Sequence, residues 1–310
     1  MINEHLSYSR LKSLLCPAKY YFYYILDIGI MNKYLLRGSL VHKYHELNFL
    51  DGGNLKINNE RIQKDIDKFI EDFKSRRKIP IITLYNGDRE EVLNYVKSIN
   101  YNILYNQLMD IQLKHIKKNP EKPLELYIEH ELKYKIDNDL FKYLLIIPDV
   151  LLNVNDSSYI IDIKTGNYYN SYDEQLYFYY YVAEKVVNVP NPMLMLYFVK
   201  NYNLRLITMD KKKAISETEK LLNLSFDYLR KHNIEDENTF MDFTKKFYKD
   251  RKLQYEFLNE IYKHVGSTIC NWCLLENCAC PIKSNISFDD ATNIILSRYS
   301  KNIQVSSKKF

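Results

Sequence analysis

The chain has 310 residues, with 44 Lys and Arg against 39 Asp and Glu, which gives a net charge of +5. This length allows one large domain or two small ones with a substantial core, and the mild positive charge is compatible with a polyanionic partner without being diagnostic of one. The sequence lacks an apolar run long enough to span a bilayer, a signal-peptide pattern and a Walker-type phosphate loop. We therefore expect a soluble, cytoplasmic protein with no membrane partner, and not an ATP-driven motor.

Helices are predicted over most of the first fifty residues. Ser7 is a suitable N-cap for a first helix, Pro17 can open a second one, and residues 38–49 predict a third. His42 lies on one side of the third helix. His45, three residues further on, is near the same side and competes with it as a candidate functional residue.

The remaining elements predict a mixed α/β protein. Residues 56–120 are polar and helix-periodic, which is typical of a helical insertion. Strand patterns follow, and the order of hairpin, helix and strand indicates a mixed αβ core. We predict strands over 124–136, 144–154, 159–165 and 193–199, a helix over 172–186, amphipathic helices over 212–265, and one helical segment in a polar tail over 281–310.

Two apolar runs on either side of residues 155–158 predict a β-hairpin, because the segment between them is polar turn chemistry. A two-residue turn would place Asp149 directly opposite Asp162, whereas a four-residue loop would place Asp149 opposite Lys164. Directly opposed side chains on one face are about 5 Å apart, and diagonal ones are about 7 to 8 Å apart. In both registers the three side chains share a face, since strand side chains alternate with period two.

Two carboxylates and an amine on one hairpin face predict a site for phosphodiester chemistry. Acids that converge on one face can hold a hard divalent cation, and a lysine beside them can stabilise a developing oxyanion or a hydroxide. A solvated hairpin face is the alternative, but charges within runs this apolar are costly to bury unless they are paired or bound to metal. Pro148 removes a ladder donor, which fits a bulge or an edge beside the site.

Four of the five cysteines, Cys270, Cys273, Cys278 and Cys280, fall within eleven residues, and Cys16 lies near the other end of the chain. A CxxC with further cysteines close behind predicts a metal or cluster site, and nothing suggests the oxidising compartment that disulfides need. With Cys16 as a fourth ligand, the site would join the two ends of the chain. Zinc and a [4Fe–4S] cluster demand the same thiolates, so the spacing does not separate them.

Taken in order, these motifs resemble the RecB-like branch of the PD-(D/E)XK nuclease superfamily. Within that branch they are most similar to the iron–sulfur members, the CRISPR-associated RecB-like exonucleases and the nuclease domain of AddB. The resemblance covers most of the chain and implies a restriction-endonuclease-like core, in which helices flank a mixed central sheet, with a helical insertion and a C-terminal cysteine region. The matching segments are Ser7-x-Ser9-x-Leu11-x4-Cys16, Gly38-x3-His42, Asp149, Asp162-x-Lys164-Thr165-Gly166, Gln175-x3-Tyr179 and the C-terminal cysteines.

The resemblance also implies roles for individual residues. His42, Asp149 and Asp162 would bind Mg²⁺ or Mn²⁺ together with the Ile163 carbonyl, and Lys164 would orient or activate the attacking water and stabilise charge on the phosphate. A further pair, Gln175 and Tyr179, lies one turn apart on a helix face that meets the active site and the DNA in relatives.

The same resemblance implies that Cys16, Cys270 and Cys273 bind a structural [4Fe–4S] cluster, with structural zinc as the alternative. The fourth ligand would be Cys280 or Cys278, because the spacing after Cys273 departs from the family pattern. Expected parts of a single nuclease domain over 1–310 are the N-terminal helices with the first cysteine and the metal-site histidine (1–50), the helical insertion (54–122), the catalytic αβ core (124–200), a helical region (201–265), the cysteine cluster (266–282) and a tail (283–310).

The leading functional hypothesis is a metal-dependent DNA exonuclease that acts on DNA that is single-stranded or has free ends, in recombination, repair or phage replication. Its partners in a bacterial or phage-infected cell would then be recombination, CRISPR or phage-replication proteins. A non-catalytic DNA-binding adaptor is the second hypothesis, and the intact Asp149, Asp162 and Lys164 argue against it. A structure- or sequence-specific endonuclease is the third, since the fold serves both activities.

Overall fold

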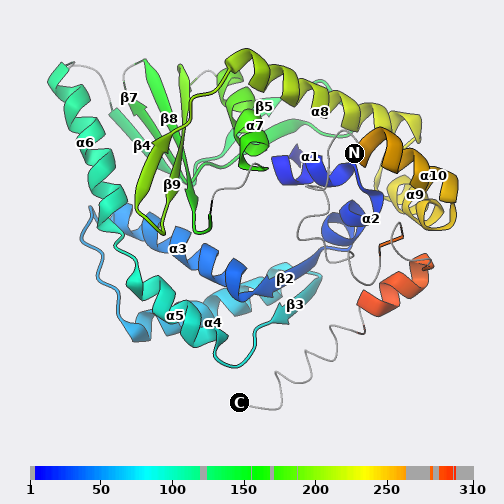
Figure 1. Cartoon of the computed structure of the whole chain (residues 1–310), viewed down its shortest axis with the longest axis horizontal. Helices are drawn as coiled ribbons and strands as arrows, with labels where there is room; N and C mark the ends of the chain where they lie inside the picture. Colours follow the sequence, from blue (N-terminus) through cyan, green and yellow to red (C-terminus); the bar gives the residue numbers. More distant parts are fainter. Residues whose placement is uncertain are drawn as a thin grey trace.

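The computed structural model describes residues 4–118, 124–154, 156–167, 171–186, 188–262, 280–281, 286–295 and 297. A five-stranded sheet forms its centre, with helices on both faces (Figure 1). Strands β8 and β9 are parallel and are joined by helix α7 (Ser171–Lys185), while the other neighbours in this sheet are antiparallel. Across the sheet the strands are β10 (Asn203–Leu206), β9 (Pro192–Phe198), β8 (Ser157–Lys164), β7 (Val150–Val154) and β4 (Leu124–Ile128).

The β7–β8 hairpin has the shorter of the two predicted turns. Val154 pairs with Ser157, and the register continues to Val150 opposite Ile161. Two residues therefore connect the strands, and continuing the register by one position places Asp149 opposite Asp162. The four-residue alternative is wrong.

Two runs predicted as single strands are each divided between two sheets. Residues 124–136 form β4 and β5 (Leu132–Lys135), and residues 144–154 form β6 (Tyr143–Ile146) and β7. Strands β5 and β6 belong to a three-stranded sheet with β1 (His5–Leu6). The second division falls at Pro148, which cannot donate to a ladder and so ends one pairing before the next begins.

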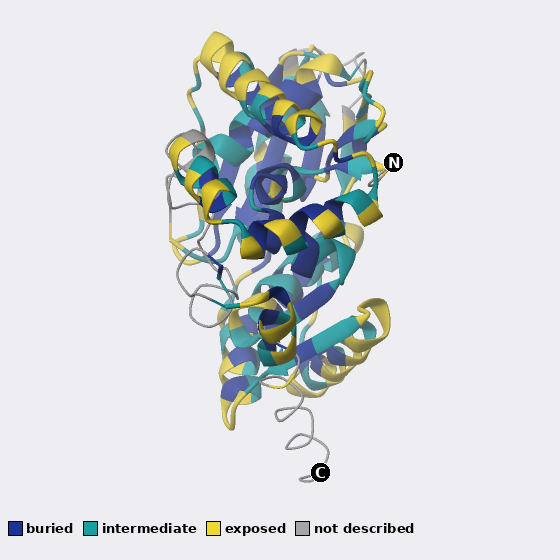
Figure 2. Cartoon of the chain, turned by 90° about the vertical axis from the view of Figure 1, so that its right-hand side faces the viewer, coloured by how far each residue is buried: buried dark blue, intermediate teal, exposed yellow. Residues whose placement is uncertain are grey.

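The alternation of β8 separates two hydrophobic clusters on the two faces of the central sheet. Ile160 belongs to a cluster that includes α7 and α8 (Lys211–Lys231), whereas Ile161 and Ile163 belong to a second cluster with α3 (Lys33–Leu50). Side chains of successive strand residues point to opposite faces, which explains why most of this strand is buried. Buried residues accordingly lie in the sheet and on the inner sides of the helices (Figure 2).

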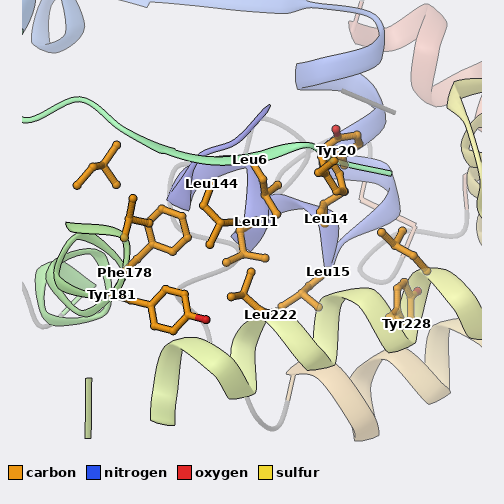
Figure 3. Close-up of a cluster of buried hydrophobic side chains, with 14 of the residues drawn as sticks. Leu6, Leu11, Leu14, Leu15, Tyr20, Leu144, Phe178, Tyr181, Leu222 and Tyr228 are labelled. Atoms are coloured by element: carbon orange, nitrogen blue, oxygen red, sulfur yellow. The ribbon is translucent and has the colours of Figure 1, made fainter. Parts of the chain in front are cut away.

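The first cluster fixes the N-terminal helices to the core. Leu11 and Leu14 of α1 (Tyr8–Leu14) lie among Phe178 of α7 and Leu222 of α8, as Figure 3 shows. Ser7 occupies the N-cap of α1 as predicted, although its side chain makes no capping hydrogen bond. The prediction that a proline opens the next helix is also confirmed by α2 (Pro17–Tyr20), which continues into the π-helical turn η1 (Tyr21–Ile25).

The region expected to be a helical insertion is largely helical but also contains a strand. Strand β3 (Ile79–Thr83) lies between helices α4 (Asn59–Arg76) and α5 (Asp88–Ser98), and α6 (Asn102–Lys118) follows α5. Strand β3 pairs in parallel with β2 (Ile28–Asn32). Neither strand was predicted, although the isoleucine-rich residues of β3 are typical strand formers. On β2, Gly29 allows α4 a close approach, since a Cβ there would lie 2.8 Å from Phe73 Cζ.

The C-terminal part of the chain packs beside the N-terminal helices. Phe288 contacts Tyr21, with ring centroids 5.2 Å apart, and Tyr248 of α9 (Glu237–Lys249), at 5.5 Å. Helices α10 (Arg251–Glu256) and η2 (Phe257–Tyr262) follow α9. Within the ranges described above, no helix is both long and apolar enough to cross a membrane.

Of the predicted cluster ligands, Cys270, Cys273 and Cys278 lie outside the described residues. Cys16 and Cys280 are both partly buried and pack against the first hydrophobic cluster.

Candidate active site

Three carboxylates lie in one row across three neighbouring strands. Strand β4 pairs with β7 so that Ile128 is opposite Val150, and the backbone bond from Glu129 N to Asp149 O, at 3.2 Å, extends this register by one residue. The β7–β8 register places Asp162 on the other side of Asp149. Glu129, Asp149 and Asp162 are thus brought side by side by strand pairing alone.

His42 reaches this row from helix α3. Its Nδ1 lies 2.7 Å from Asp149 Oδ1, while the Ile163 amide donates to the other carboxylate oxygen. One turn earlier on the same helix, Gly38 faces Thr165, in the loop that follows β8. Burial disfavours the imidazolium, but the charge and the hydrogen bond of Asp149 outweigh it and raise the pKa of His42.

Glu129 completes a group that can hold a metal ion. One ligand atom each from His42, Glu129 and Asp149 can be chosen so that all three atoms lie within 4.8 Å of one another. Glu129 follows β4 with a left-handed φ of 50°, which lets the chain turn away at the end of the strand. Desolvation and then the Asp149 charge raise the pKa of Glu129 to about 7.

Lys164 occupies the other end of the row. Its Nζ lies 2.6 Å from Asp162 Oδ2 and donates to Gln175 Oε1 at 3.1 Å, and it also lies 4.4 Å from the centroid of the Tyr172 ring. The Asp162 carboxylate is nearly buried, and burial raises its pKa despite the opposing charge of Lys164. A carboxylate oxygen has two lone pairs, so the ion pair with Lys164 still leaves Asp162 Oδ2 acceptor capacity.

Helix α7 contributes two polar side chains beside Lys164. Gln175 and Tyr179 are one turn apart on this helix and share a side-chain hydrogen bond. Burial raises the pKa of Tyr179, followed by the charges of Asp162 and Asp149, which shows that its hydroxyl lies within the electrostatic reach of the acids. The amide and the phenol therefore border the row on the side opposite His42.

The arrangement agrees with a comparison of the sequence with family models. The model of the PD-(D/E)XK nuclease superfamily matches residues 5–281. The chain belongs to the PD-(D/E)XK nuclease superfamily. Membership in this superfamily implies a nuclease with DNA as its substrate, and its members usually use Mg²⁺ or Mn²⁺.

Two further comparisons add little to the family assignment. No curated protein matches the sequence significantly. A solved structure described as "Crystal structure of SSO0001" matches 60% of this chain and 85% of its own, at 15% identity and a TM-score of 0.24. That superposition is too loose to show a shared fold.

The residues at the row fit the divalent cation that PD-(D/E)XK nucleases usually use. Carboxylate oxygens are the preferred ligands of Mg²⁺ and Mn²⁺, and an imidazole is compatible with Mn²⁺. The side chain of Asp149 is 11% exposed, Asp162 10% and His42 31%, so the ligand atoms are set back from the surface while the histidine side stays open. The Asp162 carboxylate, although paired with Lys164, keeps free lone pairs and is a further candidate ligand for a cation.

The structure brings together six residues that were all predicted from the sequence, at one end of the inner strands β7 and β8: His42, Asp149, Asp162, Lys164, Gln175 and Tyr179. Ile163 also lies at this end of the strands, where its amide contacts Asp149. His45, the competing histidine, is 1% exposed and lies against the rings of Tyr101 and Tyr197.

Glu129 was missed by sequence reasoning. It lies within residues predicted as one continuous strand, so its position at a strand end was not visible. The charged Glu129-His130-Glu131 segment inside an apolar run was the available signal, since such charges mark a break or a site.

Proposed function

We propose that this protein is a metal-dependent DNA exonuclease of the RecB-like iron–sulfur branch. The observation that carries the proposal is the row of Glu129, Asp149 and Asp162, with an imidazole at one end and an ammonium at the other. This distribution separates the groups that attract a cation from the group that attracts a phosphate oxygen. Binding alone does not require such a separation, which argues against a non-catalytic adaptor.

Each end of the row has its own task in this proposal. His42, Glu129 and Asp149 hold the divalent cation, with Asp162 as a further ligand, and the cation supplies Lewis-acid polarisation of the phosphate and of a water molecule when bound. Lys164 has three N–H donors. Asp162 and Gln175 accept from this ammonium, which leaves donor capacity for a phosphate oxygen that gains charge during hydrolysis.

The test is a nuclease assay with Mg²⁺ and Mn²⁺ on end-labelled linear DNA and on covalently closed circular DNA, each single-stranded and double-stranded. An exonuclease shortens linear DNA and leaves circles intact. Cleavage of circles would instead identify an endonuclease. DNA binding without cleavage under any divalent metal would support the adaptor and overturn the catalytic proposal.

The cysteine residues form a separate part of the proposal. We propose that Cys16, Cys270, Cys273 and Cys280 bind a [4Fe–4S] cluster, with Cys278 as the alternative fourth ligand. Support comes from the packing of Phe288 against Tyr21, which places residues from the two ends of the chain side by side. The burial of Cys16 and Cys280 against the same hydrophobic cluster gives further support.

Iron, sulfide and zinc contents of an anaerobic preparation test the cluster. We expect a brown protein with about four iron and four sulfide per chain, and Cys16→Ala should lose this colour. A colourless protein with stoichiometric zinc would replace the iron–sulfur proposal by a structural zinc site.

A further inference from the structure

A large groove leads away from the candidate active site between helices α3 and α4. Its volume is about 970 Å³, and its walls include His42 and Glu129 at the end beside the acid row. Near the end of α4 it is lined by Arg76 and Arg77, which precede β3. A chain of nucleotides that reaches the acid row therefore has a continuous path along this groove.

The charges along the groove are arranged unevenly. The carboxylates of Glu129 and Glu46 lie beside His42, where a bound cation would offset them. Lys68 and Arg76 are exposed on α4. Asp72 also lines the groove and lies one helical turn from each of them, but no described residue is within ion-pair distance of either side chain. Cations without an acidic partner can pair with phosphates without first breaking an existing salt bridge.

Aromatic side chains line the groove between these charged ends. Phe69 and Phe73 of α4 are partly exposed, and Tyr34 of α3 is 52% exposed. Arg37 lies 5.4 Å from the centroid of the Tyr34 ring. Exposed rings next to cations are the combination that single-stranded nucleic acids bind, because only unstacked bases can stack on protein rings.

We propose that the α3–α4 groove binds the single-stranded part of the DNA substrate as it leaves the acid row. Tyr34 stacks on a base, and Lys68 and Arg76 contact phosphates. The helical insertion thus supplies one wall of the substrate path. This inference rests on the proposed nuclease function, since it takes the acid row as the site of cleavage.

The experiment measures binding of a fluorescein-labelled oligothymidylate by anisotropy in Ca²⁺ at several salt concentrations, where binding can be read without cleavage. The Lys68→Ala/Arg76→Ala variant should lower the slope of log affinity against log salt by about 1.4, because each lost phosphate contact on a single strand contributes about 0.7. Tyr34→Ala should weaken binding about 5- to 100-fold, whereas Tyr34→Phe, which keeps the ring, should bind as tightly as the wild type.

A matched control removes two lysines from another helix. Lys114→Ala/Lys117→Ala makes the same charge change on exposed positions of α6, which are not part of the groove (Figure 1). In this variant the slope of log affinity against log salt should stay close to that of the wild type. An equal loss of slope in both double variants would contradict the assignment of the groove as the DNA-binding site. Unchanged binding by Lys68→Ala/Arg76→Ala and by Tyr34→Ala would contradict it as well.

Duplex DNA separates a single-strand groove from a general cation patch. We expect the groove variants to weaken binding of oligothymidylate more than binding of a blunt duplex of equal length, and equal weakening would overturn the single-strand assignment. A wild-type protein that cleaves no DNA would overturn the nuclease function, but it would leave the result of this binding experiment readable.

Discussion

The two ends of the acid row differ in the groups that neutralise the carboxylates. On the α3 side, Asp149 contacts the imidazole of His42 and lies beside Glu129, an arrangement that can hold a cation. On the α7 side, Asp162 meets the ammonium of Lys164, which also contacts Gln175. Under the proposed function, the same residue type would bind metal at one end and position a charged donor at the other, because the neighbouring helix supplies a different partner.

The largest expected effect is at the α7 end. Lys164→Ala should lower DNA hydrolysis about 10³-fold or more, because it removes the ammonium that stabilises charge on the phosphate. Binding of DNA in Ca²⁺ should change little. Lys133→Ala is the control, since Lys133 forms an exposed ion pair with Glu131 on the surface and should leave the rate unchanged. A Lys164→Ala protein with near wild-type activity would remove the distinction between the two ends.

The α3 end should respond through the metal. His42→Ala should raise the Mn²⁺ concentration for half-maximal activity at least about 10-fold, because one ligand is lost. Glu129→Gln keeps the shape but removes the charge, and we expect a shift in the same direction. Lys164→Ala should leave the half-maximal Mn²⁺ concentration of its residual activity unchanged. Its affinity for Mn²⁺, measured directly by isothermal titration calorimetry, should also stay the same. An unchanged metal dependence in both α3-side variants would assign the cation to other residues.

A smaller effect is expected for Gln175, which positions Lys164 through their hydrogen bond at 3.1 Å. Gln175→Ala should lower kcat about 10-fold with little change in KM, since a hydrogen bond to a charged group is lost. Gln175→Glu retains an acceptor and should recover part of the rate. Equal loss of kcat in both variants would contradict a role in positioning.

The smallest effect at neutral pH is expected for His45, the core histidine of α3. Burial lowers the pKa of His45 to about 3 in the folded protein. In the unfolded chain the same histidine has a pKa near 6.5, so it binds more protons there than in the folded protein as the pH falls below 6.5. The stability that depends on neutral His45 is therefore fully present above pH 6.5 and is lost on acidification. At pH 5, protonation of this histidine in the unfolded chain should lower the free energy of unfolding by about 2 kcal/mol.

His45→Phe tests this linkage by urea denaturation at pH 7 and pH 5. No described residue hydrogen-bonds to either His45 ring nitrogen, so the variant should be about as stable as the wild type at pH 7 and lose less stability at pH 5. Identical pH dependence in both proteins would show that His45 does not carry the acid sensitivity.

Much of the candidate site was accessible from local pattern. The polar turn between two apolar runs predicted the hairpin, and period-two alternation placed Asp162 and Lys164 on one face. Glu129 was not accessible in this way, because its place beside Asp149 depends on the pairing of β4 with β7, which are separated by more than twenty residues. The prediction of single strands through Glu129 and through Pro148 was wrong for the same reason, since a sequence pattern shows that a segment is extended but not which sheet it joins.

The sequence by itself determined the chemistry of the site: two acids, a lysine, and a histidine with the spacing of a known family. Strand and helix periodicities are local, and they fix which side chains share a face. The family spacing already favoured His42 over His45, and the tertiary structure supplied the physical reason: His42 contacts Asp149, whereas His45 packs against the rings of Tyr101 and Tyr197. Only the tertiary structure placed Glu129 in the row and α4 along the groove, since contacts between distant segments depend on how the whole chain packs.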